Sequence, residues 1–281
     1  MGTSRGSVRR RMLGRRLRRM REGSGFTLDE VAPKLYCSVS KLARVEAGQQ
    51  GIDPHLVKSM LDLYDVGGDR WTETLRLAEE ARKRPWWAQY RLGGDFGYVQ
   101  VETDADQVQE YTPAYVPGLL QTRDYARILF TSGVVEWTDE QLAAQLEVRM
   151  IRQRRLSDDA NPLQFVAVVG EAALRNPIGG PDVMRTQLAR MAEAAALRTV
   201  TLQVLPARCG PHASLASGFF VLSFGELGEP DMAYVEHALG AAHLEGEQEV
   251  LLARNKFDQL RTLALGPADS LALLREIAAA T

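Results

Sequence analysis

The chain opens with five segments in which apolar residues recur at the spacing of a helix. In residues 8–20 the apolar side chains share one face, arginines cover the rest, and Gly23-Ser24-Gly25 ends the segment. Two short segments follow within residues 27–48, a fourth starts at Asp53-Pro54, and a fifth runs from about 71 to 83. This pattern predicts an all-α domain of five helices.

The two short segments are predicted to be helices with well-defined starts. Thr27 is followed three residues later by Glu30, which is the spacing of a capping box, and Ser38 supplies a cap for the next helix. In that third helix Leu42 and Val45 face the core. Its outward-facing positions are Val39, Ser40, Lys41 and Arg44.

The pattern changes after Arg82-Lys83-Arg84-Pro85, which we interpret as a hinge. Beyond it, strands are predicted from runs of β-branched and aromatic residues, at 163–170, 200–205, 218–224 and 232–238, with a short one near His243. Helices are predicted from about 124, and at 138–156, 181–197, 247–264 and 268–280. We therefore expect a helical domain over residues 1–83 and a mixed α/β domain over 86–281, with antiparallel pairing among the closely spaced strands.

Charge divides the chain in a similar way. Residues 1–60 carry 13 Lys/Arg and 5 Asp/Glu, a net charge of +8, so the remainder carries −10 of the total of −2. This asymmetry favours a nucleic-acid-binding end, although a solvated basic tail would give the same count. Two cysteines far apart and no long apolar run favour a reducing cytoplasm and no membrane span.

The second and third helices form a recognisable DNA-binding pattern. A tight corner joins them, the third helix offers small and basic side chains outward, and nine arginines lie upstream. The segment resembles the Xre-type helix-turn-helix domains, the phage-repressor class; the alternative is a helical hairpin with a packing role. The matching residues are Leu17, Arg18, Glu30, Val31, Ala32, Leu35, Ser38, Ser40, Leu42, Val45, Glu46 and Gly48.

The resemblance implies roles for particular side chains. The first outward residues of the third helix reach base edges in that family, so Val39 would touch a thymine methyl and Ser40 would bond a base edge. Lys41 and Arg44 lie further along, and Arg44 would bind guanine. Phosphate contacts would come from the first helix, through Arg11, Arg15, Arg18 and Arg19.

Three positions depart from the family pattern. Leu28 stands where a polar, phosphate-bonding residue is usual, and Pro33 removes a backbone donor from the second helix. Tyr36-Cys37 occupies the corner where glycine is usual. We therefore expect an atypical corner, for which the family pattern does not fix the docking angle.

The body of the chain resembles the C-terminal domain of unknown function found on many actinobacterial Xre-type regulators. The matching pieces are Trp86-Trp87, 117–122, 124–127, 149–154, 171–175, Gln187-Leu188, 204–206, 233–236 and Ser270-Leu271. The resemblance implies a transcriptional regulator, without a known ligand. It also implies work with a small partner protein encoded nearby, in an antitoxin-like or developmental pairing. A homodimer on a near-palindromic operator follows from the symmetry of such regulators.

Aromatic and apolar residues of the body could line a groove for a partner peptide or a small molecule. Plain core is the alternative explanation, and aromatic clusters are more often core. The candidate groove residues are Trp86, Trp87, Tyr115, Pro117, Leu119, Leu120, Gln121, Glu171 and Glu236.

Catalytic and metal-binding patterns are weak. Cys209 and His212 could pair as thiol and imidazole, but no orienting acid is evident. With His237 and His243 they offer zinc-ligand types without a recognised spacing, so structural histidines are the better interpretation. Glu171 and Glu236 could act as paired carboxylates, but a cap and an ion pair explain them more simply. We expect no enzyme activity, no metal and no cofactor.

Overall fold

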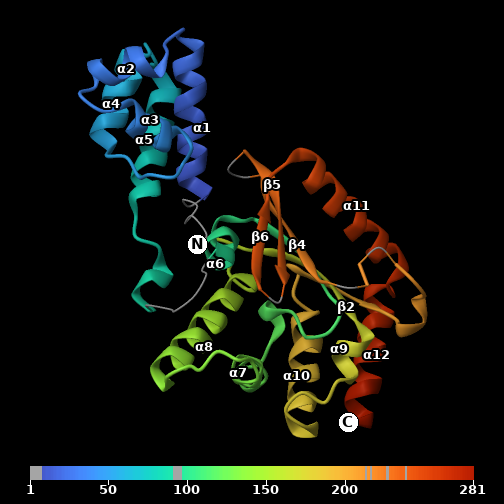
Figure 1. Ribbon diagram of the computed structural model, residues 1–281. Coiled ribbons are helices and arrows are strands. Elements are labelled where there is room, and N and C mark those ends of the chain that lie inside the picture. The colour runs from blue at the N-terminus through green and yellow to red at the C-terminus, as the bar shows by residue number, and fades with distance from the viewer. Residues whose placement is uncertain (1–7, 91–96, 213, 216, 226–227, 238) are drawn as a thin grey trace. The chain divides into compact units, whose positions relative to one another are not determined.

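Helices form at the start of the chain where the apolar pattern predicts them. The computed structural model describes residues 8–90, 97–212, 214–215, 217–225, 228–237 and 239–281. Its contacts divide the chain into two units, Met1–Ala88 with Asp95–Asp104, and Gln89–Gly94 with Ala105–Thr281. The helices of the first unit are α1 (Val8–Gly23), α2 (Leu28–Lys34), α3 (Val39–Glu46), α4 (Pro54–Leu63), α5 (Gly68–Arg82) and α6 (Gly97–Asp104) (Figure 1). A 3-10 helix, η1 (Trp86–Tyr90), follows α5.

The core of the first unit forms where α1 crosses α3. Leu17 and Leu42 are fully buried there, and Met60 and Leu61 of α4 join them. Gly14 allows the close approach, because a Cβ at this position would lie 2.5 Å from the carbonyl oxygen of Val45. Such contacts are shorter than any real Cβ makes with backbone, so the crossing requires glycine.

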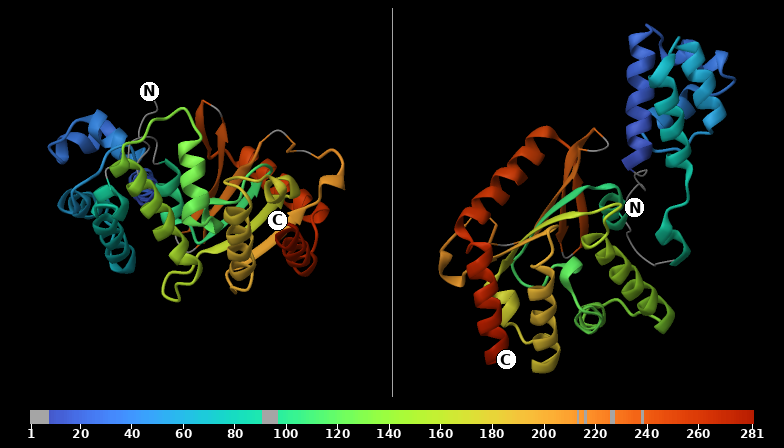
Figure 2. Two further views of the ribbon diagram at one scale, coloured as in Figure 1. Left: turned by 90° about the horizontal axis from the view of Figure 1, so that it is seen from below. Right: turned by 180° about the vertical axis from the view of Figure 1, so that it is seen from behind.

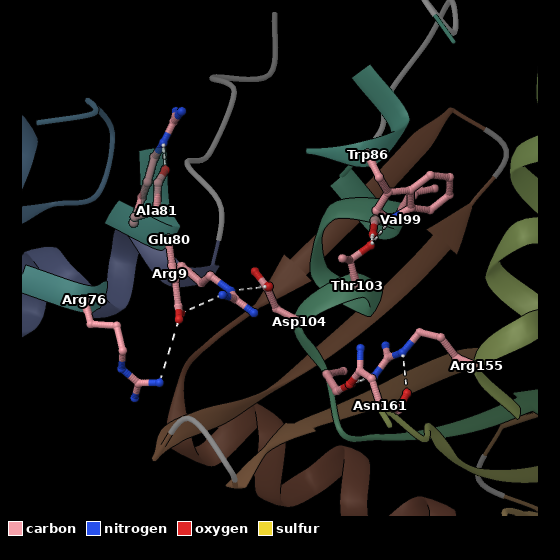
Figure 3. Close-up of polar contacts among 12 residues, drawn as sticks. Arg9, Arg76, Glu80, Ala81, Trp86, Val99, Thr103, Asp104, Arg155 and Asn161 are labelled. Atoms are coloured by element: carbon pink, nitrogen blue, oxygen red, sulfur yellow. Dashed lines mark hydrogen bonds and ion pairs between the residues drawn. The ribbon is translucent and has the colours of Figure 1, made fainter. Parts of the chain in front are cut away.

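Arg9 joins three helices of this unit. Its guanidinium donates to Glu80 of α5 at 2.7 Å and to Asp104 of α6 at 2.9 Å (Figure 3). The indole of Trp86 also donates to the hydroxyl of Thr103 at 3.2 Å. Helix α6 is therefore bonded to α1 through Arg9 and to η1 through Trp86.

The second unit is built on a six-stranded mixed sheet with the order β3-β2-β1-β4-β5-β6. Strands β1, β2 and β3 pair in parallel, while β4, β5 and β6 extend the sheet in antiparallel fashion from β1. The strands are β1 (Gln107–Thr112), β2 (Gln164–Gly170), β3 (Val200–Leu205), β4 (Phe219–Phe224), β5 (Glu229–His237) and β6 (Gly240–Leu244). The predicted mixed α/β fold with an antiparallel part is confirmed.

Helices pack on both sides of this sheet. Phe257 and Leu260 of α11 pack against Tyr111, Val168 and Val221 of the central strands. Figures 1 and 2 show α7, α8 and α10 gathered on the side of the sheet away from α11. The remaining elements are η2 (Gly118–Leu120), α7 (Arg123–Thr131), α8 (Asp139–Gln153), η3 (Arg154–Leu156), α9 (Glu171–Arg175), α10 (Pro181–Ala194), η4 (Ala207–Cys209), α11 (Glu247–Leu263) and α12 (Pro267–Ala280).

Helix α12 lies along the edge strand β3. The hydroxyl of Ser270 accepts a hydrogen bond from the backbone N–H of Val204 at 2.9 Å and so satisfies a buried strand donor. Within the described ranges, no helix combines the length and the apolar character that crossing a bilayer requires.

Candidate nucleic-acid interface

Helices α2 and α3 begin at the caps that the sequence predicts. The hydroxyl of Thr27 accepts from the N–H of Glu30 at 3.3 Å, and the carboxylate of Glu30 accepts from the N–H of Thr27 at 2.8 Å. These two hydrogen bonds complete the capping box. The carboxylate of Glu30 also accepts from the Thr27 hydroxyl at 2.9 Å, and the bonds it accepts from the backbone and the side chain of Thr27 lower its pKa. Ser38 caps α3 by accepting from the N–H of Lys41 at 3.2 Å.

The corner between the two helices is closed by backbone hydrogen bonds. The N–H of Tyr36 donates to Pro33 at 3.2 Å, and the N–H of Cys37 donates to Ala32 at 3.0 Å. This is a Schellman motif, in which the residue after the cap adopts the left-handed conformation, and Tyr36 does so with φ 51°. Pro33 lies exposed in the last turn of α2, and the helix ends one residue later.

The outer face of α3 is open to solvent. Val39, Ser40 and Arg44 are exposed, and Lys41 is half-buried. Ser40 and Arg44 are one helical turn apart, so they share a face of the helix. The Nε of Arg44 donates to Gln50 at 3.2 Å, and Gln50 follows α3 in the chain. This bond holds the guanidinium near the exposed face of α3, and among the described residues its other N–H donors have no partner.

The arginines of α1 differ in their surroundings. Arg18 and Arg19 are exposed and Arg15 is half-buried, whereas Arg11 is only 9% exposed. Arg11 packs against the end of α3, because a Cβ at Gly48 would lie 2.6 Å from its Cα. The exposed pair, Arg18 and Arg19, therefore has the access that phosphate contacts need.

A buried ion pair holds α3 against α1, and the sequence patterns gave no sign of it. The Nε and Nη2 of Arg21 donate to the two carboxylate oxygens of Glu46 at 2.7 and 2.8 Å. Nη1 of Arg21 donates to the carbonyl of Phe26 at 2.8 Å. The bonds to Glu46 raise the pKa of Arg21. Both side chains are at most 10% exposed, so the pair fixes the orientation of α3 in a water-poor setting.

The predicted groove residues of the body are distributed over both units. Trp86 and Trp87 belong to the first unit and pack edge to face, with ring centroids 5.7 Å apart. In the second unit Pro117, Leu119, Leu120 and Gln121 are buried, Tyr115 and Glu171 are half-buried, and Glu236 is exposed.

Buried amides explain why the segment around Gln121 is enclosed. Nε2 of Gln121 donates to the carbonyl of Val116 at 2.7 Å, and its oxygen accepts from Arg149. Gln153 donates to the carbonyl of Gln121 at 2.8 Å, and Gln187 donates to that of Leu120 at 2.8 Å. The backbone carbonyls of Gln121 and Leu120 thus accept hydrogen bonds from side chains of α8 and α10. These bonds satisfy buried polar groups, so they support the fold.

Two other predicted residues, Glu171 and Tyr115, interact with side chains or backbone groups of the second unit. Glu171 accepts from the Nε of Arg175 at 2.7 Å and from the N–H of Ala207 at 2.9 Å. The backbone bond is the main cause that lowers its pKa. Tyr115 has a raised pKa because it is removed from water, with a further contribution from the charges of Glu110 and Glu236. Glu171 therefore does not cap the turn that follows it, as the sequence favoured, but accepts from the first N–H of η4, 36 residues away.

Cys209 and His212 lie close to the core of the second unit. Cys209 packs against the cluster that contains Tyr111, and Nε2 of His212 is 3.5 Å from the hydroxyl of Tyr111. Burial raises the pKa of Tyr111 to about 12, with a further contribution from Cys209. Among the described residues, no group of three or more His, Cys, Asp or Glu side chains has a metal-binding arrangement.

A hollow of about 320 Å³ opens between α11 and the antiparallel strands. Its walls are mainly apolar, and its charged side chains are Glu249 and Lys256. It is lined by Ser214, Ser217, Phe219, Ala233, Val235, Leu244, Glu249, Leu252, Ala253 and Lys256. We call it the α11 pocket. The α11 pocket cannot be predicted from the sequence, because its walls come from separate segments that become neighbours only through the strand order of the sheet.

Comparison with known proteins gives a family match for each of the two units. A family model described as a helix-turn-helix domain matches residues 12–73, and this match supports a DNA-binding regulator. A model described as a domain of unknown function, DUF5753, matches residues 97–276. No curated protein and no solved structure matches the chain. Since the second match covers more than half of its length, the chain belongs to the DUF5753 family, and it carries a helix-turn-helix domain ahead of that region.

Proposed function

We propose that this protein is a sequence-specific transcriptional regulator that lays α3 in the major groove of DNA. The observation that carries the proposal is the solvent-exposed face of α3 around Ser40 and Arg44, in a domain that matches a helix-turn-helix family. The Ser38 cap and the Arg21–Glu46 pair hold that face in place. The protein acts by binding in this proposal, without catalysis.

Arg44→Ala is expected to weaken binding to the preferred duplex by about 1–3 kcal/mol and to relax the preference at one base pair. The reason is that a guanidinium can bond both acceptors of a guanine, which no other base offers. Fluorescence anisotropy with the preferred duplex and with single-base variants measures both effects. Arg19→Ala is the matched control, since this exposed arginine of α1 should weaken all duplexes alike and reduce the salt dependence. Equal behaviour of the two variants would contradict base reading by Arg44.

We further propose a homodimer on a near-palindromic operator. Dimers of this class bind two half-sites about one helical turn apart, roughly 34 Å, so that α3 of each copy faces the same side of the duplex. We infer the dimer from the two-fold symmetry that is common among regulators with one recognition helix per chain.

The C-terminal unit is proposed to sense a small molecule in the α11 pocket. Its volume lies at the lower end of the range for ligand pockets, and its mainly apolar walls carry a small number of polar groups, as such pockets do. Small-molecule sensing through the second unit would give the DNA-binding unit an input signal.

Leu252→Trp is expected to remove most of the binding of an anionic apolar probe, anilinonaphthalene sulfonate. The larger side chain would fill the pocket, whose wall includes Leu252. Leu251→Trp is the matched control, because Leu251 is equally exposed, at 56%, and does not line the pocket. Probe fluorescence in titrations of the folded protein measures the difference. If both variants bind the probe as the unsubstituted protein does, the pocket is not a binding site.

An antitoxin-like role is the second candidate. Leu251 and Leu252 leave a pair of large apolar side chains exposed on α11, as a surface that binds a partner protein would. In that case the main task is to hold a small partner protein, and DNA binding serves autoregulation. Co-purification of a small protein in a fixed ratio would favour this role over small-molecule sensing.

A further inference from the structure

Four helices of the first unit end in the same backbone turn. In each, the N–H two residues beyond the cap donates to a carbonyl in the last turn of the helix, as in a Schellman motif. The residue directly after the cap is left-handed in all four, with φ between 51° and 77°. These left-handed residues are Gly25 after α1, Tyr36 after α2, Gly48 after α3 and Asp65 after α4.

Tyr36 is the unusual member of this set. Glycine adopts the left-handed conformation without strain, and aspartate is enriched there, whereas a bulky aromatic residue is an outlier. Its side chain gains nothing from the fold, because it is 98% exposed and no hydrogen bond of its hydroxyl is found in the described chain. A strained backbone with an exposed aromatic ring points to a function outside the folded unit.

The position of Tyr36 indicates what that function is. It lies in the turn between α2 and α3, two residues before the Ser38 cap. In the described part of the first unit, the large hydrophobic side chains that remain exposed are Tyr36 and Val39. Tyr36 lies just before the helix that is proposed to enter the groove, and Val39 is the first residue of that helix.

We propose that Tyr36 is a DNA-backbone anchor, whose phenol hydroxyl donates a hydrogen bond to a phosphate oxygen beside the groove that α3 enters. This inference rests on the proposed function. The side chain lies in the turn and outside α3, so the sugar-phosphate edge is the part of the duplex that it reaches as α3 reads the bases. The phenol is a neutral donor, so it adds affinity without adding to the release of counterions.

Two substitutions of Tyr36 separate this role from a structural one. Tyr36→Phe removes only the hydroxyl and should weaken binding to every duplex by about tenfold, with the salt slope unchanged. Tyr36→Gly should weaken binding at least as much while the full-length protein unfolds at the same temperature or higher, because glycine relieves the strain. Opposite changes in affinity and stability are not expected of a residue that merely supports the fold.

Asp65→Gly is the matched control. It introduces glycine at the equivalent left-handed position after α4, where Asp65 is also exposed. It should raise the unfolding temperature less than Tyr36→Gly does, because aspartate tolerates the left-handed conformation better than tyrosine. It should leave DNA affinity equal or slightly higher, since a negative charge is lost. The measurements are anisotropy titrations at several salt concentrations and thermal unfolding by circular dichroism.

Each outcome decides the question. If the unsubstituted protein binds no duplex specifically, the proposed function itself fails. If it binds and Tyr36→Phe binds equally well, the anchor is wrong and the proposed function stands. A lower unfolding temperature for Tyr36→Gly would assign Tyr36 to the fold. A loss confined to one base sequence would make it a base contact, and this too would overturn the phosphate assignment.

Discussion

Glu46→Leu is expected to lower the free energy of unfolding of the first unit by about 3 kcal/mol. Breaking one partner of a buried ion pair costs roughly 3–5 kcal/mol, because the other charge stays buried without compensation. The lower end applies here, since Arg21 would keep its bond to the carbonyl of Phe26. Urea unfolding of the full-length protein, followed by circular dichroism, measures the change in the helical transition.

Glu22→Leu is the control for this experiment. Glu22 pairs with Arg18 at 2.8 Å and lies 3.6 Å from Arg21, but its side chain is half exposed. Exposed pairs contribute about 0–1 kcal/mol, so this variant should unfold almost as the unsubstituted protein does. The double variant Arg21→Met with Glu46→Leu should recover most of the loss, because no charge is left buried. Equal effects of Glu46→Leu and Glu22→Leu would contradict the assigned role of the pair.

Gly14→Ala is expected to destabilise the first unit by about 1–3 kcal/mol and to impair DNA binding as well. The new Cβ would lie 2.5 and 2.6 Å from the carbonyl oxygens of Val45 and Glu46. Both are backbone atoms, so relief requires that α3 move away from α1, at the usual cost of overpacking. A displaced α3 would also carry Ser40 and Arg44 away from their positions.

Gly23→Ala provides the comparison for Gly14→Ala. A Cβ at Gly23, the last residue of α1, would meet no atom within 4 Å. Alanine is favoured over glycine in helices by roughly 0.5–1 kcal/mol, so this variant should be neutral or more stable. Thermal unfolding and anisotropy titrations of both variants measure the effects. Normal stability of Gly14→Ala would mean that α1 and α3 do not cross as described.

The sequence was sufficient to predict the elements that depend on local chemistry. The caps at Thr27 and Ser38 and the buried positions Leu42 and Val45 of α3 all follow from residue type and spacing, and the structure confirms them. In the second unit, the β-branched run around Val168 predicted a buried strand, and β2 is that strand. Such features involve neighbours within one turn or one strand.

Features that depend on contacts between distant segments could not be predicted. Arg11 and Arg21 are buried while Arg18 and Arg19 are exposed, and the difference is set by where α3 crosses α1. In an arginine-rich helix the residue types alone do not reveal that crossing. The same holds for Gln121, whose side-chain oxygen accepts from Arg149, 28 residues away, and whose backbone carbonyl accepts from Gln153, 32 residues away.

Selection of bound fragments from random duplex DNA is the decisive experiment on whether α3 reads base edges. With the full-length protein, we expect enrichment of a near-palindrome whose half-sites lie about one helical turn apart. Selection with Arg44→Ala should yield the same sequence with one base pair per half-site no longer specified. A pool that shows no enrichment, or an identical motif from both proteins, would mean that α3 does not read base edges through Arg44.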